Sequence, residues 1–281
     1  MNALLSPAAA LGSAATLGVA DFAGGLAARR SPAPSVAIGM EAVGLIVTPL
    51  ALLVLPLGWD VKAMAATFVG GTVGGFGLIL FYRAMALGMF GVVAPTTAVV
   101  AAGLPSVVGV VAGGERLHVG QAAGIGAGLI AIMLINSGGG EVAGQGTRQA
   151  VALALVAGAT FGLFFVLYHV GSSAGATGFV AGRVGSGLVA LTYATVTRVR
   201  IVPLRETFPL VGLAGVLDGT GVVLYLFATF HGLLSISALL TSFYPAFTVL
   251  SARFVLHERL SALQAAGAAL AIVAVVAIAA A

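Results

Sequence analysis

The chain has 281 residues, of which 60% are hydrophobic and only 7% are charged, and its formal net charge is +4. A soluble domain carries about 25% charged residues, so this composition excludes a surface that faces water on all sides and predicts a protein embedded in lipid. The chain contains no cysteine, which excludes disulfides, thiolate metal sites and cysteine nucleophiles. With 12 basic residues, we expect loop charges that orient the chain in a membrane, and no binding of nucleic acid.

Apolar runs interrupted by charges, prolines or polar clusters predict the membrane spans, because a spanning helix needs about 20 mostly apolar residues. The start of the chain lacks a basic region, so we expect a first span there rather than a cleaved signal peptide. The runs do not alternate between polar and apolar residues, which argues against a membrane β-barrel. In chain order, ten spans are predicted at residues 7–28, 34–55, 63–86, 92–113, 120–135, 149–168, 178–197, 207–230, 235–256 and 262–280.

Glycine pairs spaced four residues apart recur within these spans. Each pair places two small residues on one helix face, which allows a neighbouring backbone to approach closely. With 41 glycines in the chain, chance alone produces some of this spacing, so we expect only some pairs to be packing sites. The pairs are Gly70/Gly74, Gly71/Gly75, Gly120/Gly124, Gly124/Gly128, Gly158/Gly162 and Gly215/Gly219.

An internal repeat divides the chain into two similar halves. The stretch ERLHVGQAAG begins at Glu115, and ERLSALQAAG begins at Glu258, 143 residues later. Tyr82 and Tyr225 share this offset. The repeat assigns five predicted spans to residues 1–140 and five to residues 141–281. Because five is odd, the second half enters the membrane from the opposite side, which predicts inverted repeats around a central cavity.

Two five-helix halves, each with Glu-Arg-Leu before its last helix, resemble the drug/metabolite transporter superfamily and its ten-helix EamA-type exporters. The second half fits better, because SFYPAFTVLSARFVLHERL has a proline thirteen residues before the glutamate. In the first half Ala102 stands at that position, with Pro105 nearby. The resemblance implies a multi-pass secondary transporter of the bacterial cytoplasmic membrane that exports small metabolites or drug-like compounds. On general similarity we favour amino-acid exporters of the YddG type.

Ionisable residues inside spans are costly in lipid and are therefore the first candidates for function. Asp21 and Asp218 are candidates for taking up a coupling proton or binding a substrate ammonium group; the alternative is a position near water or a pairing with arginine. Glu41 and Arg183 occupy corresponding places in two spans. They either pair across the pseudo-twofold axis or lie in interfacial water, and a structural role is the preferred interpretation. Arg83 has two possible roles. Its guanidinium group binds a substrate carboxylate through two hydrogen bonds, or its side chain extends to the membrane–water interface.

Aromatic residues and prolines complete the predicted site. Tyr82, Tyr225, Tyr244 and Phe164 are expected to line the substrate cavity, where tyrosine can stack on apolar groups and hydrogen-bond polar ones. For Tyr168 an interfacial aromatic belt is the preferred reading. Prolines within spans bend helices, and those expected to form hinges of a gating motion, or a static curve around the cavity, are Pro95, Pro105 and Pro245.

We therefore predict a secondary transporter, without cofactor or metal, that exports amphipathic metabolites by alternating access as a possible monomer. The only lysine, Lys62, stands in GWDVKAM, so the chain has no phosphate-binding loop of an ATP-driven pump. A channel for polar solutes is the alternative, and an intramembrane enzyme is disfavoured because His257 begins HERLS, which lacks a second histidine. The positive-inside rule places both termini outside, whereas the resembling family more usually has them inside. The arginines assigned to the cytoplasmic side are Arg29, Arg30, Arg148, Arg198, Arg200, Arg205 and Arg259, against Lys62 and Arg116 on the other side.

Overall fold

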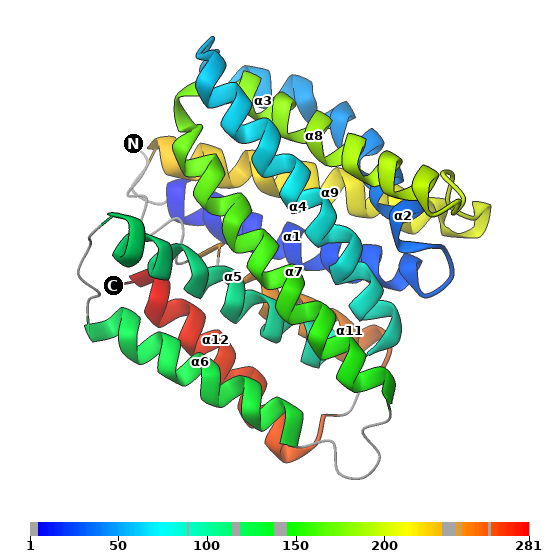
Figure 1. The fold of residues 1–281 in the computed structure, drawn as a ribbon, viewed down its shortest axis with the longest axis vertical. Helices are drawn as coiled ribbons and strands as arrows, with labels where there is room; N and C mark the ends of the chain where they lie inside the picture. The colour runs from blue at the N-terminus through cyan, green and yellow to red at the C-terminus, as the bar shows by residue number, and fades with distance from the viewer. Residues whose placement is uncertain are drawn as a thin grey trace.

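The computed structural model describes residues 5–88, 90–113, 119–137, 145–231, 240–241, 243–257 and 260–280. Throughout these residues the chain folds into helices, and no strand forms apart from an isolated bridge between Leu57 and Gly175 (Figure 1). The helices are α1 (Leu5–Ala28), α2 (Ala33–Gly44), η1 (Leu45–Val47), α3 (Thr48–Val54), α4 (Val61–Leu87), α5 (Phe90–Gly113), α6 (Val119–Ser137), α7 (Gln145–Val170), η3 (Ser172–Ala174), α8 (Gly175–Val196), η4 (Arg205–Thr207), α9 (Phe208–His231), α11 (Tyr244–Val255) and α12 (Ala262–Ala280).

Six helical segments of the described chain are long and apolar enough to cross a membrane. Three shorter apolar helices lie at Phe90–Ala101, Ala122–Ala131 and Ala265–Ala277. The prediction of an all-helical membrane protein is confirmed, whereas the count of ten spans and their inverted relation stay predictions. The six long segments are Leu5–Ala28, Ala33–Val54, Val61–Leu87, Arg148–Tyr168, Gly175–Val196 and Arg205–Tyr225.

Large apolar side chains cover the outside of the bundle. Leu53 is 82% exposed and Phe254 is 74% exposed, on α3 and α11 respectively. Soluble monomers rarely expose wide apolar surfaces, whereas lipid tails solvate such side chains well. Several polar side chains lie inside instead, including Glu41 and Arg183. This distribution, apolar outside and polar within, is that of a bundle surrounded by lipid.

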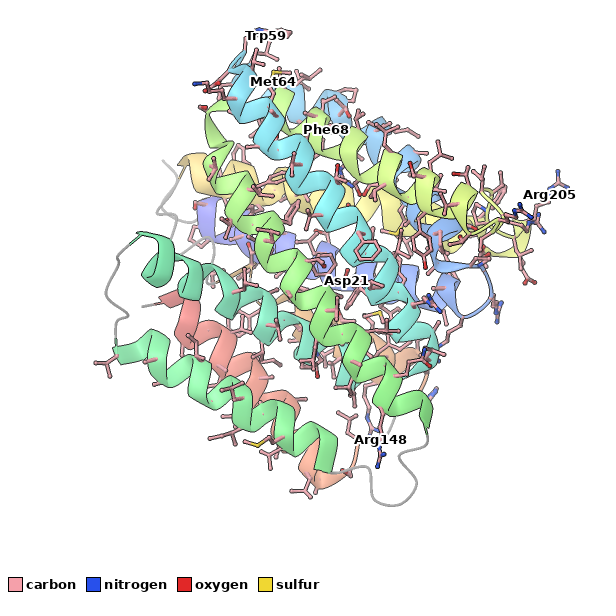
Figure 2. The ribbon with its side chains drawn as sticks, in the orientation of Figure 1. Asp21, Trp59, Met64, Phe68, Arg148 and Arg205 are labelled. Carbon is pink, nitrogen blue, oxygen red and sulfur yellow. The ribbon has the colours of Figure 1, made fainter. Side chains whose placement is uncertain are left out.

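The helices pack in pairs that join distant parts of the chain. α1 packs along α9, α4 packs along α7 and α8, and α6 packs along α12. Figure 1 shows α6 and α12 side by side at one edge of the bundle, with α2, α3 and α8 at the opposite edge. The start of α1 and the end of α12 lie toward the same end of the bundle. Figure 2 places Arg148 and Arg205 toward the other end, and Trp59 far from both.

Glycines on α4 allow two neighbouring helices to approach closely. A Cβ atom at Gly71 would overlap the carbonyl oxygen of Gly182, and one at Gly75 would lie 2.7 Å from Cα of Ser186, both on α8. The other pair of α4, Gly70 and Gly74, faces α7. Four of the predicted pairs are therefore packing sites, because Gly158/Gly162 face α5 and Gly215/Gly219 face α2 and η1.

The second predicted span is helical but irregular. Its α-helix ends at Gly44, a 3₁₀ turn follows at Leu45–Val47, and α3 begins at Thr48 with Pro49 in its first turn. Proline has no backbone N–H, so Pro49 cannot donate the hydrogen bond to Leu45 that would continue the α-helix. The break thus lies inside the span, one turn after Glu41.

A second junction ties the loop before α4 to the start of α8. The Asp60 carboxylate accepts hydrogen bonds from the backbone N–H groups of Lys62 (3.0 Å) and Ala63 (3.2 Å), which caps α4. Its other oxygen accepts a hydrogen bond from the Ser173 hydroxyl at 3.0 Å. The backbone N–H of Ala63, followed by Ser173, lowers the pKa of Asp60 from its ordinary value. The Thr177 hydroxyl also donates to the carbonyl of Gly58.

Candidate functional site

An ionic cluster lies inside the bundle where α2, α8 and α9 meet. Nη1 of Arg183 donates to Oε2 of Glu41 at 3.2 Å and lies 2.6 Å from Oδ2 of Asp218. One guanidinium nitrogen thus bridges two carboxylates from two other helices. In surroundings of low dielectric such charge-assisted contacts are strong, and a charge without its partner is costly.

The sequence around Arg183 holds its side chain in place. Ser186, one turn further along α8, donates a hydrogen bond to Oε1 of Glu41 at 2.7 Å. Phe179, one turn before, lies under the guanidinium with 5.2 Å between Cζ and the ring centroid. Gly44 leaves room on α2, since a Cβ there would lie 3.2 Å from Nη1 of Arg183. The cluster therefore depends on side chains from one face of α8 and a small residue opposite.

The members of the ionic cluster differ in exposure. The side chains of Arg183 and Glu41 are each 8% exposed, whereas that of Asp218 is 25% exposed. Glu41 is also held by Ser186, while Asp218 has Arg183 as its ion-pair partner. Asp218 is therefore the member whose carboxylate a small ligand can reach with least disruption.

Asp21 lies beside this cluster on α1, in the middle of the molecule (Figure 2). It is half-buried and close enough to Asp218, Tyr82 and Tyr244 for electrostatic interaction. The structure thus brings together four of the predicted site residues: Asp21, Asp218, Tyr82 and Tyr244. It also adds Glu41 and Arg183, which the sequence suggested as a pair and not as part of a site.

Tyr82 belongs to the packed core between helices. Its side chain is fully buried, and its hydroxyl lies 2.7 Å from Sδ of Met40 on α2. Its ring fills the space left by Gly24 on α1. Its predicted counterpart Tyr225 is half-buried on α9. The two repeat-related tyrosines therefore have different surroundings, and Tyr225 is the one with accessible surface to offer a solute.

Phe164 and Arg83 make contacts other than those of the ionic cluster. Phe164 packs on Tyr168 with ring centroids 4.1 Å apart and faces Gly74 of α4. Arg83 is exposed near the end of α4, and its Nη1 donates to the Tyr193 hydroxyl at 3.3 Å. Of the two possible roles of Arg83, this placement agrees with a side chain that reaches the interface.

The predicted hinge prolines have different positions. Pro95 is buried inside α5, and Pro105 also falls within that helix. Pro245 instead stands in the first turn of α11, which begins at Tyr244 after a turn at Phe243. The expectation that Pro245 lies well inside a continuous helix over residues 235–256 is therefore corrected. Proline suits the first turn of a helix, where its missing N–H has no helical partner to bond.

Sequence reasoning missed the role of Ser186 in the site and the irregular helix at Pro49. The span predicted at residues 34–55 runs through Pro49, although proline lacks the N–H that a continuous helix uses. Ser186 stands between two glycines, and its hydroxyl donates the hydrogen bond that holds Glu41. The repeated motif residues Glu115, Arg116, Glu258 and Arg259 lie outside the described residues. Within the described chain no group of three or more histidine, aspartate or glutamate side chains is arranged to hold a metal ion.

The apolar helices, the lipid-type surface and the buried charges define a multi-pass membrane protein. Residues 148–280 match the model of the EamA-like transporter family. A solved crystal structure, described only as that of a protein, is similar with a TM-score of 0.64 and 17% identity. The similarity covers 97% of this chain and 95% of that one, and it shows a shared fold. No curated protein sequence matches the chain.

Proposed function

We propose that the chain is a secondary transporter that exports small amphipathic metabolites, amino acids of the kind handled by YddG-type exporters first among them, across a bacterial cytoplasmic membrane. The observation that carries the proposal is the ionic cluster of Glu41, Arg183 and Asp218. Charges inside a lipid-embedded bundle mark substrate or ion pathways by default. The match of residues 148–280 to the EamA-like transporter family supports the same class.

The packing pattern supports alternating access between two inverted halves. If the first half corresponds to the second as α1 to α7, α2 to α8, α4 to α9, and α6 to α12, exchange of the halves turns the pair α1 and α9 into the pair α7 and α4. In the structure α1 packs along α9, and α7 packs along α4. The same exchange converts the pair α2 and α8 into itself, and likewise the pair α6 and α12, and the two helices of each pair also pack together. Such a relation allows two similar conformations that open to opposite sides.

The substrate class follows from the groups with accessible surface near the ionic cluster. Asp218 offers a partly exposed carboxylate, which suits an ammonium group. Tyr225, about two helical turns along α9 from Asp218, and Tyr244 on α11 are half-buried and offer aromatic faces for an apolar side chain. A small amine with an apolar part satisfies both, and amino acids are the simplest such compounds.

The test is solute flux into proteoliposomes that contain the purified protein alone, over a panel of amino acids and other amines. We expect counterflow of at least one apolar amino acid, a strong loss in Asp218→Asn, and near-normal flux in Arg83→Gln, which changes an exposed charge. Absence of flux across the whole panel would refute the proposal, and single-channel currents in a planar bilayer would favour a channel instead.

A further inference from the structure

We propose that Asp21 is a proton-binding site whose occupancy controls the packing of α1 against α9. The proposal deepens the proposed function and rests on it for the link to transport, since it names the ion that couples the two halves. The reaction is a simple protonation, in which the Asp21 carboxylate takes a proton from water that reaches the site and returns it on the other side.

The first argument is the balance of charge. Asp21 is close enough to Asp218 for electrostatic interaction, and Asp218 shares the guanidinium of Arg183 with Glu41. Arg183 bridges Glu41 and Asp218, and Ser186 donates a further hydrogen bond to Glu41. In the described part of the chain Asp21 has neither a hydrogen bond nor an ion pair. An ionised carboxylate without partners is costly away from water, and a bound proton removes that cost.

The second argument is the set of groups that face Asp21. α1 packs against α2, α4, α9 and α11. The ionisable groups near Asp21 on these helices are Asp218 on α9, Tyr82 on α4 and Tyr244 on α11, while Glu41 on α2 lies beyond Asp218 in the ionic cluster. Each of these is neutral or negative, so none can balance a negative charge on Asp21. Arg183, the cation that Asp218 contacts, is already shared by Asp218 and Glu41.

The third argument is the register of α1 on α9. The Ser6 hydroxyl donates to the carbonyl of Ala228 at 2.9 Å, and the Ser13 hydroxyl donates to that of Gly221 at 2.7 Å. Leu17 fills the space at Gly221. These α1 residues follow one helix face, and Asp21 is four residues beyond Leu17 on that face. The next turn of α9 carries Asp218, which explains why the two aspartates interact.

Proton occupancy therefore acts on a closely packed interface between the two halves. With Asp21 protonated, α1 packs on α9 as the structure shows. With Asp21 ionised, like charges face each other across that interface at the end of a run of close contacts, and separation of α1 from α9 relieves the repulsion. A proton gradient can then favour one packing on each side of the membrane.

The test is infrared difference spectroscopy of the full chain in lipid, which detects the carbonyl stretch of a protonated carboxylic acid as pH is changed. The chain has only 8 acidic side chains, so the background is small. We expect wild type to show the band of a protonated carboxyl, and we expect that band to disappear as the pH is raised. The signal should vanish in Asp21→Asn and persist in Asp60→Asn, which changes an exposed aspartate.

Asp21→Glu keeps a carboxyl group and should move the band while retaining its titration, which gives a readout if Asp21→Asn does not reconstitute. The proposal is overturned if wild type lacks such a band, if the band survives in Asp21→Asn, or if Asp21→Glu leaves it unmoved. This readout needs no substrate, so its failure beside measurable flux would refute the proton site and leave the proposed transport standing. Absence of flux would refute the transport proposal alone.

Discussion

Arg183 and Glu41 are 142 positions apart in the chain, yet their side chains meet at 3.2 Å inside the bundle. One residue lies on α8 of the second half and the other on α2 of the first. Since each is 8% exposed and Asp218 shares the same guanidinium nitrogen, the contact joins the halves through charges that have little access to solvent. The contribution of this contact to the stability of the fold is therefore best tested by substituting one partner at a time.

Arg183→Gln should destabilise the protein strongly, because it leaves the carboxylates of Glu41 and Asp218 without a cation. Removal of one member of a buried pair typically costs about 3–5 kcal/mol. Thermal unfolding in detergent, followed by size-exclusion chromatography, measures the loss. The double variant Glu41→Gln with Arg183→Gln should recover part of it, and the exposed Arg83→Gln should change little. Equal unfolding midpoints for Arg183→Gln and Arg83→Gln would contradict the role of the cluster.

Gly71→Ala should force α4 and α8 apart, because its Cβ would overlap the carbonyl oxygen of Gly182. Overpacking of this kind costs about 1–3 kcal/mol. Gly212→Ala on α9 is the matched control, since a Cβ there meets nothing within 4 Å, and alanine is favoured over glycine within helices. A lower melting temperature for Gly71→Ala than for Gly212→Ala is expected. The reverse order would show that α4 and α8 do not pack as described.

The cap of α4 should depend on pH through Asp60. Its pKa is lowered in the folded protein, so its contribution to stability is present above the unfolded value of about 3.9 and is lost as pH falls through the folded value. The protection of the Lys62 and Ala63 amides, measured as the exchange rate relative to that of an unstructured chain at the same pH, should fall at acidic pH in wild type. Asp60→Ala should show low protection at every pH. Asp60→Asn keeps an acceptor and should remove the pH dependence; an unchanged acid response in that variant would assign it to another group.

The absence of cysteine makes the orientation directly measurable. Trp59→Cys and Glu206→Cys place single thiols at exposed positions, and Arg205, beside Glu206, lies far from Trp59 in Figure 2. The positive-inside rule assigns the arginine-rich end to the cytoplasm. A membrane-impermeant maleimide should therefore label Trp59→Cys in intact cells and Glu206→Cys only after permeabilisation. Opposite labelling would place both termini inside, as is more usual in the resembling family.

Much of the helical layout could be predicted from the sequence, because in lipid a long apolar run must satisfy its backbone hydrogen bonds within a helix. The helix α12, at Ala262–Ala280, agrees with the expected residues 262–280 within the precision of such boundaries. The differences fall at prolines. Pro49 accompanies a 3₁₀ turn inside the second span, and Pro245 begins a helix instead of bending one. Hydropathy does not register either event, since the residues around both are apolar.

The candidate site was harder to predict than the helices. Asp21, Asp218, Glu41 and Arg183 stand out as charges in apolar runs, so their identity could be read from the sequence. Their grouping depends on which helix faces meet, and the sequence around a polar residue does not indicate which helix it will contact. Tyr82 shows the same limit, because a buried core position between Met40 and Gly24 and a cavity position share the same apolar flanks.

The 3₁₀ turn at Leu45–Val47 divides the second span into two short rods. Glu41 is carried by the first rod, so its bond to Arg183 joins that rod to α8 through charge. The second rod is held by apolar packing instead, because Ala51 and Leu55 share a buried cluster with Ala176 and Phe179 of α8. One span therefore meets α8 in two chemically different ways, and substitutions in either contact can be tested without touching the other.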